Sequence, residues 1–73
     1  MRLGERIPLD WFEVEATSDG YWMWAADDSA PVADVRTLPD SCQVCMFRSG
    51  LQFRCASLDD AERKIAACRT LGL

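Results

Sequence analysis

Four short turn signals at regular intervals constrain the fold of this 73-residue chain more than any other feature. They are Ser18-Asp19-Gly20, the segment 27–31, Pro39-Asp40-Ser41 and Arg48-Ser49-Gly50, all rich in residues that favour turns. The segments between them are rich in Trp, Val, Phe, Cys and Thr, and short apolar segments between regular turns are typical of an antiparallel meander. We therefore expect strands at about 11–17, 21–27, 32–37, 42–48 and 51–57.

The last segment of the chain changes its hydrophobic period. From residue 57 onward, apolar side chains recur at steps of three and four, which is one stripe of a helix: Leu58, Ala61, Ile65, Cys68 and Leu71. Ser57 stands where an N-cap belongs, with Asp60 three residues later, and Gly72 can end the helix. The expected helix covers about 58–71.

The length of the first hairpin loop decides which side chains face that helix. A three-residue loop, Ser18-Asp19-Gly20 with Gly20 left-handed, pairs Val14 with Trp24 and places Trp22 on the same face. A two-residue Asp19-Gly20 turn would place both tryptophans beside Glu13 and Glu15 instead. Because register follows the pairing that gathers apolar side chains on one side, we expect Trp22 and Trp24 to be buried. The expected face of this hairpin comprises Phe12, Val14, Ala16, Trp22, Trp24 and Ala26.

Three-residue loops at Pro39-Asp40-Ser41 and Arg48-Ser49-Gly50 extend the same apolar face. They add Ala33, Val35, Cys45, Phe47, Leu51, Phe53 and Cys55, together with Gln43. The prediction is one domain spanning 1–73, of α+β class, with a four- to five-stranded antiparallel meander and one C-terminal helix packed on one face. The first nine residues carry no clear signal, although Leu3, Ile7 and Leu9 could pack at a sheet edge.

No motif in the chain indicates catalysis or a cofactor, and we expect neither. Histidine, the commonest general base and metal ligand, is absent from the sequence. Glu13 and Glu15 share a strand face, but nothing on an open sheet would exclude water from them. Cys42 and Cys45 point to opposite faces of a strand, whereas Cys45, Cys55 and Cys68 fall on the expected core side. Structural thiols are therefore expected rather than a zinc site, with a disulfide as another alternative.

The net charge indicates a class of partner, and the absence of signal and membrane segments indicates a location. Twelve acidic and eight basic residues give a net charge of −4, which disfavours direct binding to phosphates and favours a basic protein surface. A purely solubilising role of the charge is the alternative. The N-terminus has no apolar h-region, and no apolar run approaches the ~20 residues of a membrane span. We expect a cytoplasmic protein.

The outward face of the first hairpin is the candidate binding surface. It would carry aromatic and Met side chains among carboxylates, which is the composition of an interface hot spot. A second acidic cluster follows it in the sequence. The predicted partner-binding residues are Trp11, Glu13, Glu15, Tyr21, Met23, Asp27, Asp28 and Asp34.

The tail FRSGLQFRCASLDDAERKIAAC, residues 47–68, resembles the strand–turn–strand–helix ending of small phage and mobile-element domains, some of which read DNA with a sheet. In those DNA readers the exposed sheet face carries Arg and Lys. Here Glu13, Glu15 and Asp34 stand there beside Arg36 and Arg54. The small, acidic, single-domain profile is similar to phage-encoded inhibitors such as anti-CRISPR proteins. The resemblance implies a protein that occludes a nucleic-acid-binding surface of a host defence complex. The alternatives are a structural module that dimerises through a sheet edge and a weak nucleic-acid binder that uses Arg36, Arg48 and Arg54.

Overall fold

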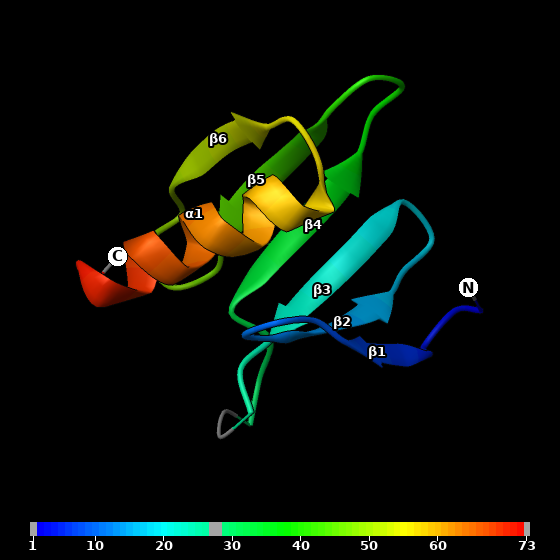
Figure 1. Ribbon diagram of the computed structural model, residues 1–73, viewed down its shortest axis with the longest axis horizontal. Coiled ribbons are helices and arrows are strands. Elements are labelled where there is room, and N and C mark those ends of the chain that lie inside the picture. The colour runs from blue at the N-terminus through cyan, green and yellow to red at the C-terminus, as the bar shows by residue number, and fades with distance from the viewer. Residues whose placement is uncertain (1, 27–28, 73) are drawn as a thin grey trace.

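The protein is a six-stranded antiparallel sheet with one helix on one face. The computed structural model describes residues 2–26 and 29–72. Its elements are β1 (Arg6–Pro8), β2 (Glu13–Ala16), β3 (Gly20–Trp24), β4 (Ala33–Thr37), β5 (Cys42–Met46), β6 (Gln52–Cys55) and α1 (Leu58–Thr70). The strands follow one another across the sheet in chain order, and α1 packs on β4, β5 and β6 (Figure 1). The predicted meander with a C-terminal helix is confirmed, with six strands in place of four or five.

The additional strand is β1, in the part of the chain that carried no clear strand signal. Ile7 lies opposite Val14, and the N–H of Leu9 donates to the carbonyl of Phe12 at 2.7 Å. Pro8 has no N–H to donate, and it is tolerated because β1 is an edge strand. Ile7 and Leu9 are half-buried against the core as expected, but Leu3 is 71% exposed and does not pack there.

The core between the sheet and α1 consists mainly of small or flexible side chains. Its largest fully buried members are Met23, Met46, Ile65, Val14, Val35 and Val44. The helix adds Ala61 and Ile65 to the buried set, with Leu58 and Cys68 half-buried at its margins. Leu71, which the stripe included, is exposed because the helix ends at Thr70. Methionine suits such a core, since its unbranched chain fills irregular gaps.

Both helix ends follow their sequence signals. The hydroxyl of Ser57 accepts from the N–H of Asp60 at 3.2 Å, and the Asp60 carboxylate accepts from the N–H of Ala56 at 3.0 Å. The first bond satisfies a donor that the first helical turn leaves without a partner, and the second ties the residue before the N-cap to the helix. At the other end, Gly72 adopts a φ of 81°, the left-handed conformation that terminates helices.

The first hairpin corrects the predicted register. Thr17 pairs with Gly20 around a two-residue Ser18-Asp19 turn, through an N–H···O bond of 2.9 Å. Glu13 therefore lies opposite Trp24, and Glu15 lies opposite Trp22. Relative to the predicted three-residue loop, this is a shift of one residue, which moves every β3 side chain to the other face.

The physical reason for that shift is the position of Gly20. It does not occupy a left-handed turn position but lies inside β3, against the backbone of β4. A Cβ added there would lie 1.9 Å from the carbonyl oxygen of Val35, so only glycine allows the two strands to approach. The glycine that suggested a three-residue loop is thus required by strand packing, and the burial predicted for Trp22, Trp24 and Ala26 is wrong.

The other two hairpins are displaced by one residue in the same way. Leu38 pairs with Ser41 around a two-residue Pro39-Asp40 turn, which places Val35 opposite Val44. In the last hairpin, Val44 lies opposite Phe53 and Cys42 opposite Cys55, and Met46 bonds to Leu51 across the turn. As a result, Cys42, Val44 and Met46 are buried, in place of the predicted Gln43, Cys45 and Phe47. Gly50 adopts the left-handed conformation in this last turn, with a φ of 75°.

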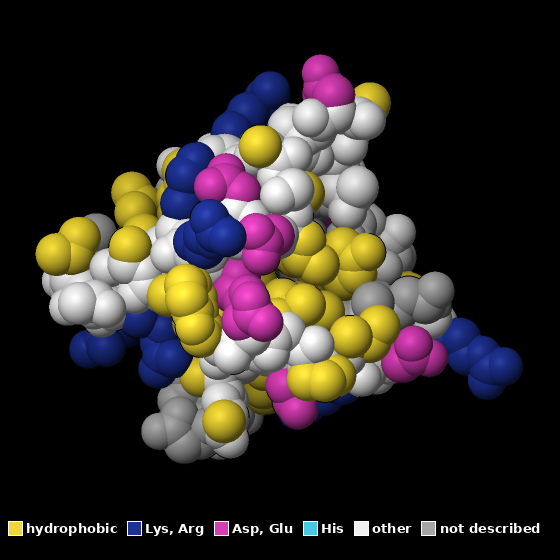
Figure 2. All heavy atoms as spheres, in the orientation of Figure 1, with side chains coloured by type: hydrophobic (Ala, Val, Ile, Leu, Met, Phe, Trp, Pro, Cys, Tyr) yellow, Lys and Arg dark blue, Asp and Glu magenta, His cyan; other side chains and the backbone are white. Residues whose placement is uncertain are grey.

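Leu51 was also expected in the core and is 39% exposed, whereas Ala33, Val35, Phe53 and Cys55 lie where the sequence placed them. Acidic and basic side chains alternate over α1 on the helix side of the molecule, and hydrophobic side chains gather between the helix and β1–β3 (Figure 2). None of the described helices is long and apolar enough to span a membrane.

Candidate functional site

The sheet face opposite α1 is the candidate site, and we call it the open sheet face. No described element packs on it. Its side chains follow from the strand register: Arg6, Pro8, Glu13, Glu15, Trp22, Trp24, Asp34, Arg36, Gln43, Cys45, Gln52 and Arg54. One row crosses all six strands, in the order Arg6, Glu15, Trp22, Asp34, Cys45 and Gln52. Trp22 thus stands between two carboxylates, near the middle of the face, and it is 38% exposed.

Arg6 organises the acidic part of this face. Its guanidinium lies 3.6 Å from the Glu13 carboxylate and 3.5 Å from that of Glu15. The same guanidinium carbon is 3.9 Å from the centroid of the Trp24 ring. Stacked on its ring, Arg6 covers Trp24 and leaves Trp22 as the more accessible tryptophan. The Trp24 indole N–H is buried, and among the described residues it has no hydrogen-bond partner.

Asp34 stands beside Trp22 and carries an electrostatic cost. Burial raises the pKa of this carboxyl above its ordinary value, and the nearby Asp19 carboxylate raises it further. Arg36 opposes the rise, although its guanidinium is 3.5 Å from Asp19, with which it forms an ion pair. The ionised form of Asp34 is therefore less stable in the folded protein than in water.

The structure brings together only part of the predicted site. Glu13, Glu15 and Asp34 lie on the open sheet face, whereas Met23 is fully buried and Tyr21 is half-buried against the core. These two placements are corrections, and both follow from the shifted β3 register. Trp11 is 59% exposed but lies in the loop between β1 and β2. Asp27 and Asp28 lie outside the described residues.

Sequence reasoning missed Trp22 and Trp24 as surface residues. The alternative hairpin, with a two-residue turn, already placed them beside Glu13 and Glu15. The actual turn is one residue earlier still, but any two-residue loop gives the same faces, because register parity alone decides them. An isolated glycine within a strand pattern is the signal that could have favoured this reading.

A second acidic group lies where the β1–β2 loop meets the helix. The carboxylates of Asp10, Asp59 and Glu62 lie within 4.8 Å of one another. Glu62 is only 2% exposed, and one of its oxygens accepts from the N–H groups of Trp11 at 2.8 Å and Phe12 at 3.1 Å. Glu62 thus has a structural role, since it ties the β1–β2 loop to α1 through two charge-assisted hydrogen bonds.

The cysteines are free thiols on both sides of the sheet. Cys42 and Cys45 lie on opposite faces, as the strand alternation predicted, but the buried member is Cys42 and not Cys45. Cys42 and Cys55 face each other across β5 and β6, and burial raises the pKa of both thiols. Within residues 2–26 and 29–72, the acidic group above is the only close cluster of three metal-ligand side chains.

We compared the chain with known protein families, curated proteins and solved structures. No family model, no curated protein and no solved structure matches this chain.

Proposed function

We propose that this protein acts by binding another protein, and that the open sheet face docks on a basic surface of that partner. The observation that carries the proposal is the pair of tryptophans on an uncovered sheet, with Glu13, Glu15 and Asp34 around them. Tryptophan is enriched among the residues that dominate binding energy at interfaces. The sheet holds Trp22 in place before binding, so little conformational entropy remains to be lost.

The charge distribution supports a basic partner. Residues 1–35 contain eight acidic and two basic side chains, whereas residues 36–73 contain four acidic and six basic ones. β3, which carries both tryptophans, thus comes from a strongly acidic half of the chain. Acidic side chains around an aromatic anchor attract a basic surface over long range and speed the encounter.

Two costs on the open sheet face are consistent with a binding role. The ionised Asp34 is disfavoured by partial burial, and the Trp24 indole N–H has no described partner. Unsatisfied or destabilised polar groups are common where function competes with stability. A basic partner would stabilise the Asp34 carboxylate by placing a cation beside it.

The partner class that we propose is a nucleic-acid-binding protein whose basic groove is occluded by this acidic domain. The resemblance to small phage-encoded inhibitors suggests a host defence complex of the CRISPR–Cas kind. In this proposal the protein acts in the cytoplasm, without catalysis and without a cofactor. Dimerisation through the β6 edge is less favoured, because Lys64 Nζ lies 3.4 Å from the Arg54 carbonyl and blunts that edge.

Capture from a bacterial lysate, quantified by mass spectrometry, is the first test. We expect a basic protein or complex that is retained by the native chain and by Trp11→Ser but lost with Trp22→Ser. Trp11 is the matched control, since it is an exposed tryptophan outside the strands of the sheet. Retention by Trp22→Ser equal to that of the native chain would contradict the proposal.

Association kinetics with the captured partner then separate steering from anchoring. Glu13→Lys combined with Glu15→Lys should slow association, and the loss should shrink as salt is added. Trp22→Ala should instead speed dissociation, by about tenfold or more. An association rate that ignores both salt and the acidic substitutions would remove electrostatic steering from the proposal.

A second candidate function is the binding of single-stranded nucleic acid. A row of three side chains on the open sheet face favours it. Arg36, Gln43 and Arg54 lie side by side across β4, β5 and β6. Arginines beside an exposed aromatic ring are typical of single-strand binding surfaces. Fluorescence anisotropy with a labelled oligonucleotide at low salt separates the candidates. Tight binding that Arg54→Ala weakens and Glu13→Lys leaves unchanged would replace the protein-binding proposal.

A further inference from the structure

The open sheet face already holds one guanidinium group, which belongs to the protein itself. The guanidinium carbon of Arg6 lies 3.9 Å from the centroid of the Trp24 ring. Two carboxylates meet the same group at its edge, Glu13 at 3.6 Å and Glu15 at 3.5 Å. An indole ring beneath and carboxylates at the edge suit arginine, because its planar group stacks on aromatic rings and donates hydrogen bonds from its rim.

Trp22 stands in a similar setting without a cation. It lies two residues before Trp24 on the same face of β3, with Glu15 opposite it on β2 and Asp34 opposite it on β4. It is 38% exposed, and no Lys or Arg among the described residues stands over its ring. The residues outside the described ranges include neither Lys nor Arg. The Trp22 ring is therefore open to a cation from another molecule.

Asp34 is the carboxylate beside Trp22 that has no ion pair among the described residues. Glu15, on the other side of Trp22, is already paired with Arg6. Burial raises the pKa of Asp34, and Arg36 only partly offsets this rise, since its ion pair is with Asp19 at 3.5 Å. A further cation beside Asp34 would stabilise the ionised carboxylate.

We propose that Trp22 and Asp34 form a binding site for an arginine side chain of the partner protein. This inference rests on the proposed function and names the group of the partner that the open sheet face recognises. The guanidinium stacks on the Trp22 ring and donates from its edge to the Asp34 carboxylate. Lysine fits this site less well, because its ammonium is compact and strongly hydrated and cannot form two parallel bonds to a carboxylate.

Titration with acetyl-arginine amide, followed by NMR, tests the site without the partner. We expect a saturable shift of the Trp22 indole N–H signal, larger than the shifts of the other two indoles. Acetyl-citrulline amide has nearly the same shape without the charge and should bind at least about tenfold more weakly. Acetyl-lysine amide should bind about threefold more weakly than the arginine probe.

Asp34→Asn should weaken binding of the arginine probe about tenfold, because it removes the charge-assisted bonds. The variant should fold normally, since the substitution removes a charge that burial disfavours. Binding of the citrulline probe should change little, because that probe has no charge to pair with Asp34.

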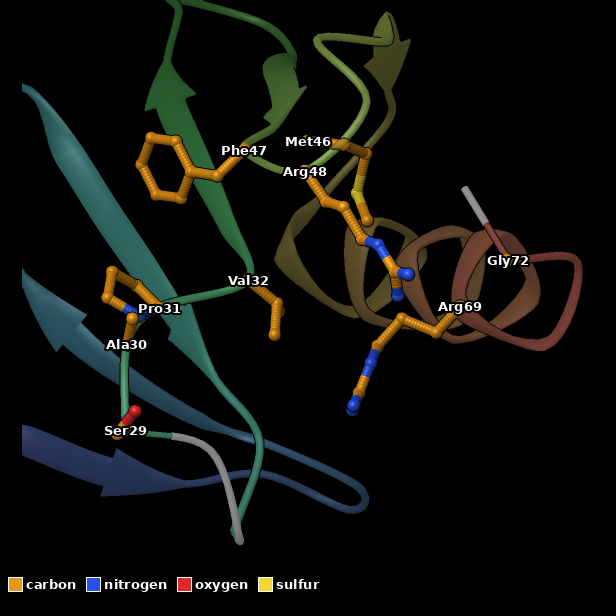
Figure 3. A pocket seen from close by; sticks show the side chains of 9 residues that line it. All are labelled: Ser29, Ala30, Pro31, Val32, Met46, Phe47, Arg48, Arg69 and Gly72. Atoms are coloured by element: carbon orange, nitrogen blue, oxygen red, sulfur yellow. The ribbon is translucent and has the colours of Figure 1, made fainter.

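Phe47→Ser is the control variant. Phe47 is 49% exposed just beyond β5 and extends away from the helix, whereas Met46 and Arg48 extend toward it (Figure 3). The N–H of Phe47 donates to the carbonyl of Val32 at 3.1 Å, so its neighbour across the strands is Val32 and not Asp34. Removing this exposed ring should leave binding of the arginine probe unchanged.

The arginine site is overturned if the citrulline or lysine probe binds as tightly as the arginine probe, if Asp34→Asn has no effect, if Phe47→Ser weakens binding as much as Asp34→Asn, or if no saturable shift occurs. Failure of the proposed function looks different, because capture from the lysate would then not depend on Trp22. Capture that is lost with Trp22→Ser, together with no binding of the arginine probe, would refute the arginine site alone.

Discussion

The two faces of the sheet carry different hydrophobic side chains. The face that meets α1 buries Val, Ala and Met side chains, whereas the open sheet face carries Trp22 and Trp24 among charged residues. Tryptophan is the largest hydrophobic side chain, yet in this protein it does not mark the core. Among the described residues, the largest fully buried side chains are Met, Ile and Val, and none of them is aromatic. The two tryptophans of β3 stand on the side away from the helix, whereas Phe12, Tyr21 and Phe53 pack with the core on the helix side.

The largest expected difference between the two faces is in stability. Met23→Ala should lower the free energy of unfolding by about 2–5 kcal/mol, because it leaves a cavity in a fully buried site. Trp22→Ala, one residue away on the opposite face, should cost only about 1 kcal/mol or less. Urea denaturation of both variants measures the contrast. A larger loss for Trp22→Ala would mean that the open sheet face is covered in solution.

Thiol reactivity should distinguish the same two faces. Cys45 is half-buried on the open sheet face, whereas Cys42 and Cys55 are buried and burial raises the pKa of both thiols. Since the thiolate is the reactive form, Cys45 should be alkylated at least about tenfold faster in the folded protein. Mass spectrometry of tryptic fragments after brief iodoacetamide treatment measures this ratio. Cys45→Ser should remove the fast phase from the β5 fragment, whereas Cys68, which is also half-buried, is followed separately in its α1 fragment. Earlier labelling of Cys42 would contradict the β5 register.

The smallest expected effect concerns Asp34. Because the pKa of Asp34 is raised in the folded protein, the folded state holds this proton more tightly than the unfolded chain. The contribution of Asp34 to stability therefore falls as the pH rises from about 3.8, the ordinary pKa, through the raised pKa of the folded state. At any higher pH the full destabilisation remains. Asp34→Asn should stabilise the protein at pH 7 by at most about 0.5 kcal/mol, since solvent screens a half-exposed group.

The measurement for Asp34 is urea denaturation at pH 3 and pH 7. At pH 3, where the carboxyl is protonated in both states, the gain should disappear. Asp40→Asn, at an exposed turn position, is the control and should show no such difference. The same stabilisation at both pH values would mean that the effect of Asp34→Asn does not arise from its charge.

Features decided by neighbouring residues could be read from the sequence. The helix was predicted almost to its ends, because Ser57, Asp60 and Gly72 act within one turn of each terminus. The order and antiparallel arrangement of the strands followed from the turn signals. Of the candidate site, Glu13, Glu15 and Asp34 were placed on the outward face, since strand alternation alone put them there.

Contacts between distant residues could not be read in this way. The role of Glu62 depends on Trp11 and Phe12, which lie about fifty positions earlier, and no local pattern announces it. The row of side chains from Arg6 to Gln52 likewise forms only when all six strands pair. Such sites depend on the tertiary arrangement, because their members share no sequence neighbourhood.

The sequence by itself determined the sheet order, the helix and its caps, because turns, hydrophobic period and capping act over a few residues. Only the tertiary structure decided which faces of β3 and β5 are buried. In both strands, each of the two faces offers apolar side chains. In β3, either Met23 or the pair Trp22 and Trp24 could face the core, and in β5 either Val44 or Cys45 could do so. The close approach of Gly20 to the Val35 carbonyl fits only the β3 register that buries Met23 and leaves Trp22 and Trp24 on the other face. A one-residue change in loop length is enough to exchange the two, since side chains alternate along a strand.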